Sequence, residues 1–279
     1  MKQSNLPTNH LNPMRIAVLS DIHGNLPALE TILADIDAWQ PDKVIVNGDV
    51  VNRGPKPREC WQLIDTRIRE QGWIMTRGNH EEFVVEWDTP RVKLGSAEAD
   101  LFQSSLWTYH QLPASAIAYF KTLPIGHSET LFETSIRFNH ASPHGTRDGI
   151  GPWNNDDEVR RKIAPAPDLF FTAHTHRLFV RQIDQTQVIN SGSVGVPLDN
   201  DKRANYARLS WQDQWQIELI RLDYDRAQTQ RDFNEVNYCE ECGVSSALLY
   251  LEWRDAQSYV PDFFRTYGQA IREGTLTVA

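Results

Sequence analysis

Short apolar runs alternate with amphipathic segments along the first part of the chain. Residues 15–20 and 43–47 are apolar runs rich in β-branched side chains, as buried parallel strands are. In residues 26–39 the apolar positions recur at i, i+3, i+4 and i+7, which is one face of a helix. A second helix is predicted over residues 57–68, because proline suits a first turn, and a third strand over residues 72–76. This strand–helix–strand alternation predicts an α/β fold with parallel strand pairing.

The middle of the chain is first helical and then extended. Residues 81–123 have a helical pattern rich in aromatic side chains, with Pro113 between two predicted helices. Strand character returns at residues 136–140 and 168–173, and the glycines and prolines of residues 142–157 predict a loop. We therefore expect the helical segment to be an insertion in the α/β domain.

The last part of the chain has a different pattern. Residues 206–210 and 215–222 predict antiparallel strands, and a polar helix is predicted from near Asp225. The aromatic residues between Trp253 and Tyr267 show no clear periodicity, and they would form either a dimer surface or a cover for the core. We expect a disordered tail over residues 1–13 and a single domain over residues 14–279, with the helical insertion at about 81–123 and a C-terminal extension at about 225–279.

Composition narrows the classes of function. The formal net charge is −9 and the sequence has no run of Lys or Arg, which argues against a nucleic-acid partner. It has no apolar stretch long enough to span a membrane and no apolar secretory segment at its start. Three cysteines are too few for a disulfide framework, so a cytoplasmic location is expected. Cys239 and Cys242 form a C-x-x-C pair that we interpret as ordinary thiols, since zinc would need two further soft ligands.

Metal-binding side chains stand at the end of each predicted strand of the α/β part. In chain order these are Asp21 and His23, Asp49, Asn79 and His80, His140, and His174 and His176. Five of the nine histidines lie at these strand ends, which a set of unrelated structural histidines does not explain. In open α/β sheets, ligands bind outside the carboxyl ends of the strands, so we expect these side chains to converge.

The mixture of oxygen and imidazole donors predicts the kind of cofactor. Carboxylate and amide oxygens together with imidazoles suit Mn, Fe, Zn, Co or Ni better than Mg or Ca. A pair of ions needs a bridging carboxylate, and Asp49, which follows the small residue Gly48, is the natural bridge. We therefore expect two divalent metal ions, with Mn as the first choice.

The order of these motifs resembles that of a known family. The series consists of D-I-H at residues 21–23, G-D-x-x-x-R-G at 48–54, G-N-H-E at 78–81, a strand-end histidine at 140 and A-H-T-H at 173–176. It resembles the calcineurin-like metallophosphoesterase superfamily over about residues 14–223. Residues 21–30 and 190–195 resemble its small prokaryotic phosphodiesterase branch. The resemblance implies a four-layer α/β/β/α sandwich of two mixed sheets flanked by helices.

The resemblance also implies roles for individual residues. One metal would be held by Asp21, His23, Asp49 and His176, and the other by Asp49, Asn79, His140 and His174. His80 would not be a ligand but would stabilise the transition state and help to protonate the leaving oxygen. Arg53 matches an arginine that contacts phosphate in some branches, although a solvated loop arginine explains it equally well. His144 and Arg147 are further phosphate candidates by their proximity to His140.

The leading hypothesis is a dinuclear-metal hydrolase that cleaves small phosphate esters, above all phosphodiesters, by direct attack of a metal-bridging hydroxide. One alternative is a Ser/Thr protein phosphatase or a dinucleoside-polyphosphate hydrolase. Asn52 counts against the protein phosphatase, because such relatives carry an aspartate there that pairs with the catalytic histidine. Another alternative is a non-catalytic scaffold, but this chain keeps every expected ligand and His80. The oligomeric state stays open.

Overall fold

Two mixed five-stranded sheets pack face to face in this protein. The computed structural model describes residues 14–90 and 96–276, so the tail predicted over residues 1–13 lies outside the described residues. In spatial order the first sheet contains β10 (Gln214–Leu222), β9 (Ala204–Gln212), β1 (Arg15–Leu19), β2 (Lys43–Val46) and β3 (Ile74–Met75). The second contains β4 (Gly126–Leu131), β5 (Thr134–Asn139), β6 (Leu169–Thr172), β8 (Thr186–Asn190) and β7 (Phe179–Ile183). In each sheet three adjacent strands are parallel and the others pair antiparallel.

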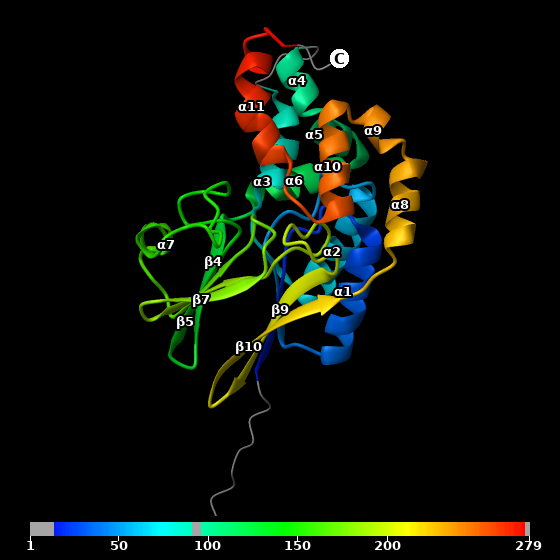
Figure 1. The fold of residues 1–279 in the computed structure, drawn as a ribbon. Helices are drawn as coiled ribbons and strands as arrows, with labels where there is room; N and C mark the ends of the chain where they lie inside the picture. The colour runs from blue at the N-terminus through cyan, green and yellow to red at the C-terminus, as the bar shows by residue number, and fades with distance from the viewer. Residues whose placement is uncertain (1–13, 91–95, 277–279) are drawn as a thin grey trace, which may run out of the picture.

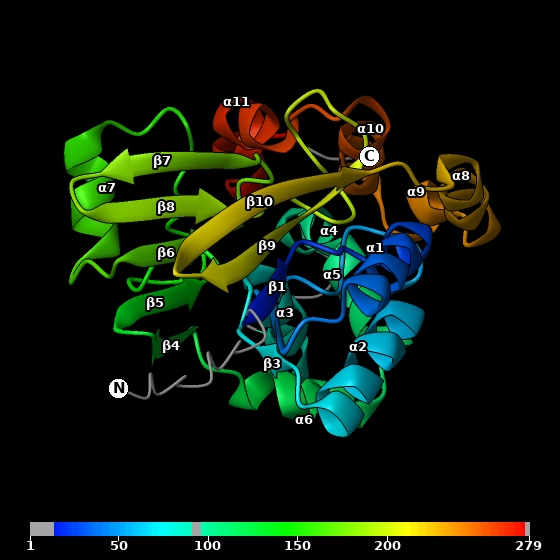
Figure 2. The same ribbon diagram turned by 90° about the horizontal axis from the view of Figure 1, so that it is seen from below.

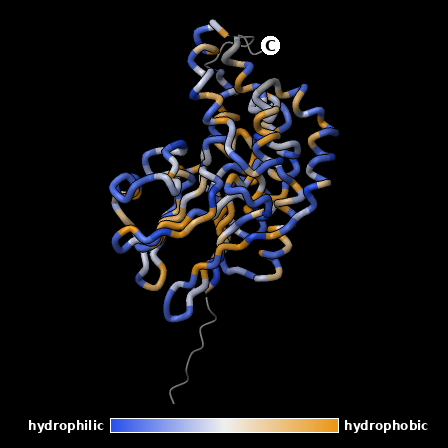
Figure 3. The backbone as a smooth tube through the Cα atoms, viewed as in Figure 1, coloured by the Kyte–Doolittle hydropathy of each residue, from blue (hydrophilic) through white to orange (hydrophobic). Residues whose placement is uncertain are grey.

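Helices cover the outer faces of both sheets, which produces the expected four layers (Figure 2). Helices α1 (Leu26–Trp39) and α2 (Pro57–Gln71) pack on the first sheet, and α7 (Asp156–Ile163) packs on the second. In β1, Ile16 and Val18 face the second sheet, whereas Ala17 and Leu19 face the helices. Because both faces of these strands are buried, they read as continuous apolar runs, and the apolar segments in Figure 3 follow the strands.

Additional helices gather at one end of the sandwich (Figure 1). The predicted insertion forms α3 (Asn79–Val85), the short helix η1 (Glu86–Asp88), α4 (Ala97–Leu101), α5 (Gln103–Gln111) and α6 (Ala114–Thr122). The C-terminal extension forms α8 (Arg226–Glu235), α9 (Tyr238–Glu241), α10 (Val244–Asp255) and α11 (Val260–Arg272). Helix α10 contacts α4 and α5, and α11 contacts α4. We call α3, α4, α5, α10 and α11 together the helical cap.

The C-terminal extension has a small core of its own. Trp253 is 3% exposed and packs against Phe233, and both belong to a cluster that includes Tyr238 and Cys242. Tyr267, in contrast, is 46% exposed. The aromatic segment whose place the sequence left open therefore covers the core at its beginning and faces outward towards its end.

Most predicted elements are present, and the differences have local causes. The strand predicted over residues 72–76 is reduced to Ile74–Met75, because Gly72 adopts a φ of +70° and caps the end of α2. Strands β4 and β7 were not predicted, since as edge strands they carry polar residues on an exposed face. Among the described residues no helix has both the length and the apolar character needed to cross a membrane.

Candidate dinuclear metal centre

The loops that follow the strands hold the side chains predicted as metal ligands in an uncommon backbone conformation. Asp21 and His23 after β1, Asp49 after β2, and His174 and His176 after β6 have φ angles between 50° and 63°. A residue with a Cβ atom rarely adopts this left-handed region, and doing so costs about 1–3 kcal/mol. Five such residues at three strand ends indicate that surrounding contacts hold the loops in place.

Hydrogen bonds between the loops supply those contacts. The backbone N–H groups of Ile22 and His23 donate to the Asp49 carbonyl, at 2.8 and 3.1 Å. The Ser193 hydroxyl and the Gly195 N–H both donate to the Asp21 carbonyl, at 2.7 and 2.9 Å. The motif at residues 190–195 therefore fixes the loop of Asp21 and His23 from the second sheet.

A close backbone approach explains the glycine before Asn79. A Cβ atom on Gly78 would lie 2.0 Å from Oδ1 of Asp49, and this clash excludes every residue other than glycine. Gly48, which has a φ of +84°, packs against Gly78, since a Cβ atom added to Gly48 would lie 2.7 Å from the Gly78 Cα. The second and third strand ends can meet only because both positions are glycine.

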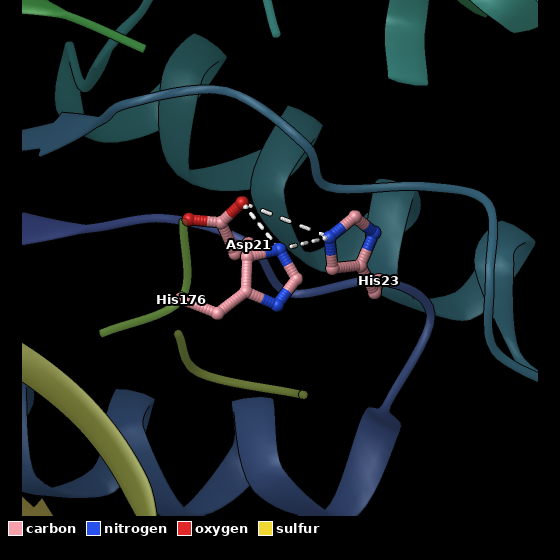
Figure 4. Close-up of side chains that lie close together, drawn as sticks. All are labelled: Asp21, His23 and His176. Atoms are coloured by element: carbon pink, nitrogen blue, oxygen red, sulfur yellow. Dashed lines mark hydrogen bonds and ion pairs between the residues drawn. The ribbon is translucent and has the colours of Figure 1, made fainter. Parts of the chain in front are cut away.

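The first cluster of side chains consists of Asp21, His23 and His176 (Figure 4). The His176 Nε2 atom lies 3.1 Å from both Asp21 Oδ1 and His23 Nε2, and the His23 Nε2 atom lies 3.7 Å from Asp21 Oδ1. All three residues are buried. With metal–nitrogen bonds of about 2.0–2.1 Å, donor atoms some 3–4 Å apart can reach one ion.

The second cluster consists of Asp49, Asn79, His140 and His174. The His140 Nε2 atom lies 3.1 Å from both Asp49 Oδ2 and Asn79 Oδ1. The His174 Nδ1 atom lies 2.8 Å from Asn79 Oδ1. Asp49, His140 and His174 also form a group whose ligand atoms lie within 4.8 Å of one another. The seven residues predicted as ligands are thus brought together in two adjoining clusters.

Two buried carboxylate oxygens in this region have no hydrogen-bond partner among the described residues. They are Asp21 Oδ1 and Asp49 Oδ2. Asp49 Oδ2 lies 3.8 Å from His23 Nε2, so this oxygen faces both clusters. A buried, unpaired carboxylate oxygen is costly, whereas a cation satisfies it. The oxygen and imidazole donors therefore fit a dinuclear site for divalent transition metals.

The charges of the aspartates decide which histidine carries a proton when no metal is bound. Burial by itself would lower the pKa of His140, but the Asp49 and Asp21 carboxylates outweigh it and raise the pKa to about 10. Burial lowers the pKa of His23 to about 4 and that of His174 to about 3. One imidazolium thus partly neutralises the carboxylates, and a divalent metal would replace that proton.

Backbone carbonyls orient two of the rings. The His140 Nδ1 atom lies 2.8 Å from the Asn47 carbonyl, and the His176 Nδ1 atom lies 2.5 Å from the Val196 carbonyl. A carbonyl only accepts hydrogen bonds, so Nδ1 must carry the proton in each ring. The Nε2 atoms of both rings are then turned towards the clusters, which is the arrangement common in histidine ligands.

Glu81 supports the centre, although its place in the G-N-H-E motif gave it no role in the sequence analysis. Its Oε2 atom accepts hydrogen bonds from the N–H groups of Asp49 and Gly78, at 2.8 and 2.9 Å. Its Oε1 atom accepts one from the Val50 N–H at 2.8 Å. Burial and the charge of Asp49 raise the pKa of Glu81 to about 7. The bond from Gly78 follows from capping-box spacing at the start of α3, but only the fold brings the Asp49 loop onto this carboxylate.

His80 borders both the clusters and a cavity. Its backbone N–H donates to Asp49 Oδ1 at 2.8 Å, and its ring meets the His23 ring edge-on at 4.7 Å between centroids. The Asn52 Nδ2 atom lies 2.8 Å from His80 Nδ1, so Asn52 is the neighbour of this ring as the motif comparison implied. Since Asn52 Oδ1 already accepts from the Arg53 N–H, the amide donates to the ring. The proton of a neutral His80 ring therefore sits on Nε2.

The three candidates for phosphate binding lie in different places. Arg53 and Arg147 line the same cavity as His80. The Arg53 guanidinium forms an ion pair with the buried Glu252, and the Arg147 guanidinium lies 4.4 Å from the centre of the Phe83 ring. His144 does not line this cavity.

His144 lies instead in an exposed hollow beside α7. It shares this hollow with Asp148 and Lys162, and its Nε2 atom donates to the Arg161 carbonyl at 3.0 Å. The turn between Ser142 and Gly145 reverses the chain just after His140. His144 is therefore close to His140 in sequence but lies outside the cavity that His80 lines.

Comparisons with known proteins agree with this geometry. Residues 14–178, more than half of the chain, match the sequence model described as calcineurin-like phosphoesterase. An uncharacterised protein of Methanocaldococcus jannaschii is 30% identical over 232 residues, which cover 75% of this chain and 88% of that protein.

Solved structures show the same fold. A metallophosphoesterase from Sphaerobacter thermophilus superposes with a TM-score of 0.67 and 28% identity, over 88% of this chain and all of that one. A protein of Pyrococcus horikoshii superposes with a TM-score of 0.71 and 21% identity, over 82% of this chain and 96% of that one. The family match, the two-sheet sandwich and the buried Asp/His clusters together show that this chain belongs to the calcineurin-like family of metal-dependent phosphoesterases.

Proposed function

We propose that the protein hydrolyses small phosphodiesters with two divalent metal ions bound at its Asp/His clusters. Asp21, His23, Asp49 and His176 would hold one ion, and Asp49, Asn79, His140 and His174 the other. The observation that carries this proposal is the pair of buried oxygens, Asp21 Oδ1 and Asp49 Oδ2, that face ring nitrogens and have no hydrogen-bond partner among the described residues. Asp49 would be shared, because its Oδ2 atom lies near rings of both clusters.

When bound, the ions would supply positive charge to the phosphoryl oxygens and activate a water near neutral pH. The chain itself positions the groups around them. Glu81 holds the N–H groups of Asp49 and Val50, and so fixes the loop that carries the shared carboxylate. His80 lines the cavity, and its Nε2–H would donate to a phosphoryl or leaving-group oxygen. Arg147 would add positive charge at the cavity wall, and Arg53 would position the loop that carries Asn52.

A preference for diesters is supported by the partner of His80. An aspartate at position 52 would stabilise an imidazolium, whereas the Asn52 amide donates to Nδ1 and opposes protonation there. The His80 ring beside Asn52 is therefore less readily protonated, and a neutral ring suits a monoanionic diester better than a dianionic monoester. The cavity of about 420 Å³ beside His80 fits a small molecule, which argues for such a substrate over a phosphoprotein.

Two further parts of the proposal concern the metal and the compartment. The mixed nitrogen and oxygen donors support Mn²⁺. The free thiols of Cys60, Cys239 and Cys242 support a cytoplasmic location, where thiols stay reduced. Metal analysis and fractionation of cells that express the native protein test these two points, and a different predominant metal or recovery outside the cytoplasm would refute them.

An activity panel tests the proposed reaction. Chromogenic phosphodiesters and phosphomonoesters are assayed with metal-free protein reloaded with Mn²⁺, Ni²⁺, Co²⁺, Zn²⁺ or Mg²⁺. We expect hydrolysis that depends on added metal, is fastest with Mn²⁺ and favours the diester in kcat/KM. Hydrolysis that persists after complete removal of metal would contradict the mechanism, and a higher kcat/KM for the monoester would contradict the diester preference.

A further inference from the structure

A cavity of about 420 Å³ opens directly from the proposed metal centre into the helical cap. Asn79, His80 and His174 line it on the side of the clusters. On the other side its walls come from α3, α4, α5, α10 and α11. Its volume lies in the range of sites for small ligands. Any molecule whose phosphate reaches the clusters therefore places the adjoining group in this cavity.

Aromatic and aliphatic side chains form most of the cavity wall. The His80 ring meets the Phe83 ring edge-on at 5.3 Å between centroids, and Phe83 lies 5.6 Å from Phe102. Phe264 of α11 and Leu248 of α10 also line the cavity. A row of rings thus runs from the catalytic histidine into the cap. Such a surface favours an aromatic partner, since ring pairs at 4.5–7 Å are attractive beyond their buried area.

A buried ion pair joins the cap to the loop next to the metal centre. The Arg53 guanidinium pairs with the Glu252 carboxylate of α10, which is fully buried. The other oxygen of Glu252 accepts hydrogen bonds from the N–H groups of Tyr259 and Val260, at 2.7 and 2.8 Å, where α11 begins. One carboxylate therefore holds α10, α11 and the loop of Asn52 together, and the cavity is formed before a ligand binds.

The positive charge at the cavity further limits the class of ligand that it suits. Arg147 and Arg272 line the cavity. Arg147 lies 3.6 Å from the Glu86 carboxylate, and no ion pair of Arg272 is found with the side chains that the structure describes. In a chain of net charge −9, two guanidinium groups beside an apolar wall suit an anion that carries an apolar group. It does not suit a neutral hydrocarbon or a cationic peptide.

We propose that this cavity receives a flat aromatic ring that the substrate carries next to its phosphate ester, in contact with Phe83, Phe102 and Phe264. This inference rests on the proposed function, because the clusters fix the phosphate end of the substrate. The ring of an aryl ester and the base of a nucleotide share this chemistry. The substrate class is therefore aromatic phosphoesters, and the insertion and the C-terminal extension together select it.

Direct binding tests the inference without relying on turnover. Dissociation constants are measured by calorimetry on Mn²⁺-loaded protein for two matched pairs of non-hydrolysable ligands. The aryl pair is phenylphosphonate and methylphosphonate. The nucleotide pair consists of the 5′-phosphonate analogues of adenosine monophosphate and of ribose 5-phosphate. We expect the ring-bearing member of at least one pair to bind about tenfold more tightly, from ring contacts and burial. A difference within the aryl pair indicates an aryl ester as the substrate, and a difference within the nucleotide pair indicates a nucleotide.

Substitutions of aromatic residues in the cavity wall test where the ring of the ligand binds. Phe102→Ala and Phe264→Ala should reduce the tenfold difference to about threefold or less, and Phe264→Leu, which keeps apolar volume, should give an intermediate value. Phe132→Ala is the matched control, because Phe132 is 43% exposed at the turn between β4 and β5 and does not line the cavity. Thermal melts of each variant identify any loss of folding, and the leucine variant keeps the test valid if an alanine variant unfolds.

Each outcome decides between the two proposals. Equal affinity within both pairs would overturn the aromatic site, as would a difference that the Phe102 and Phe264 variants leave unchanged. Hydrolysis of a chromogenic diester is measured on the same preparation. Discrimination in binding without any hydrolysis would overturn the proposed function alone, whereas hydrolysis without discrimination would overturn only the aromatic site.

Discussion

The metal centre and the cavity beside it are built in different ways. The proposed ligands lie in the loops after the strands or, for Asn79, at the start of α3, and all of them except the partly buried His174 are buried. Their loops are held by hydrogen bonds between backbones of both sheets. The cavity wall consists of helix side chains such as Phe83, Phe102 and Phe264, which are only partly buried. One buried ion pair, between Arg53 and Glu252, joins α10 to the loop beside the centre.

This difference suggests that the sandwich and the cap have separate functions. The sandwich positions the chemistry with little freedom, since a shift in either sheet would separate ligands that come from β1, β2, β5 and β6. The helices α4, α5, α10 and α11 of the cap can vary without disturbing those ligands, because their described residues contribute walls and no donor to the clusters. Changes in the centre should therefore affect rate and metal content, and changes in the cap should affect substrate affinity.

The largest effect is expected at the shared carboxylate. Asp49→Ala should lower hydrolysis to the background rate and lose metal, because one side chain serves both clusters. Metal content is measured by mass spectrometry on the purified variant, with Asp88→Ala as the surface control. Near-normal content of two metals in Asp49→Ala would show that the centre is not assembled as proposed.

The second test separates catalysis from assembly within the centre. His80→Ala should keep the fold and the metal but lose about 10²- to 10⁴-fold in kcat, the range for one acid–base group. The loss should be smaller for substrates with better leaving groups, which need less help from a hydrogen-bond donor. His110→Ala on the exposed face of α5 is the control. Since His80 also lies within reach of His23 and Asp49, a variant that has lost its metal would identify it as a ligand.

The third test concerns the support of the Asp49 loop. Glu81→Gln replaces one acceptor oxygen by an NH₂ group, so at least one backbone N–H loses its partner. We expect the free energy of unfolding to fall by about 2 kcal/mol. The rate should fall about tenfold, as for other changes behind metal ligands. Urea titration and kinetics measure both, with Glu70→Gln on the exposed face of α2 as the control. An unchanged rate would mean that Asp49 keeps its position without Glu81.

The fourth test addresses the cap. Glu252→Gln weakens the link to Arg53, and we expect KM to rise roughly fivefold with kcat nearly unchanged, equivalent to about 1 kcal/mol of binding. Glu235→Gln is the matched control, because Glu235 also pairs with a residue of the same loop region, Lys56, but is 67% exposed. Should kcat fall and KM stay constant, the ion pair would serve the centre and not the cavity.

The smallest effect is expected from Asn52→Asp. Burial lowers the pKa of His80 well below its usual value, and the amide of Asn52 opposes a proton on Nδ1. A carboxylate at this position accepts that proton and favours the charged ring, so the pKa of His80 should rise by about one unit or more. NMR titration of Zn²⁺-loaded protein measures the pKa, and an alkaline limb of the rate profile that belongs to His80 should move upward with it. An unchanged pKa would mean that Asn52 does not govern the proton on this ring.

Several features could be read from the sequence because they depend on local order. Burial on both faces makes β1 a continuous apolar run, and Asn25 and Pro27 mark the start of α1. Parallel strands end at one edge of a sheet, so the motifs at those ends predict a shared site without knowledge of distances. The family and the four-layer sandwich, which the resemblance of the motif series implied, are confirmed by the comparisons and the two-sheet architecture.

Other features were decided only by the tertiary structure, because they join residues that are far apart in the chain. Arg53 pairs with Glu252 across 199 positions, and the wall of the cavity combines Phe83 with Phe264. The periodicity of the sequence does not predict such contacts, because each depends on how whole helices pack against the sandwich. The reverse case is His144, which is close to His140 in sequence but is turned away by a tight loop. Local pattern thus determined which chemistry the chain carries, and the packing of distant helices decided what surrounds it.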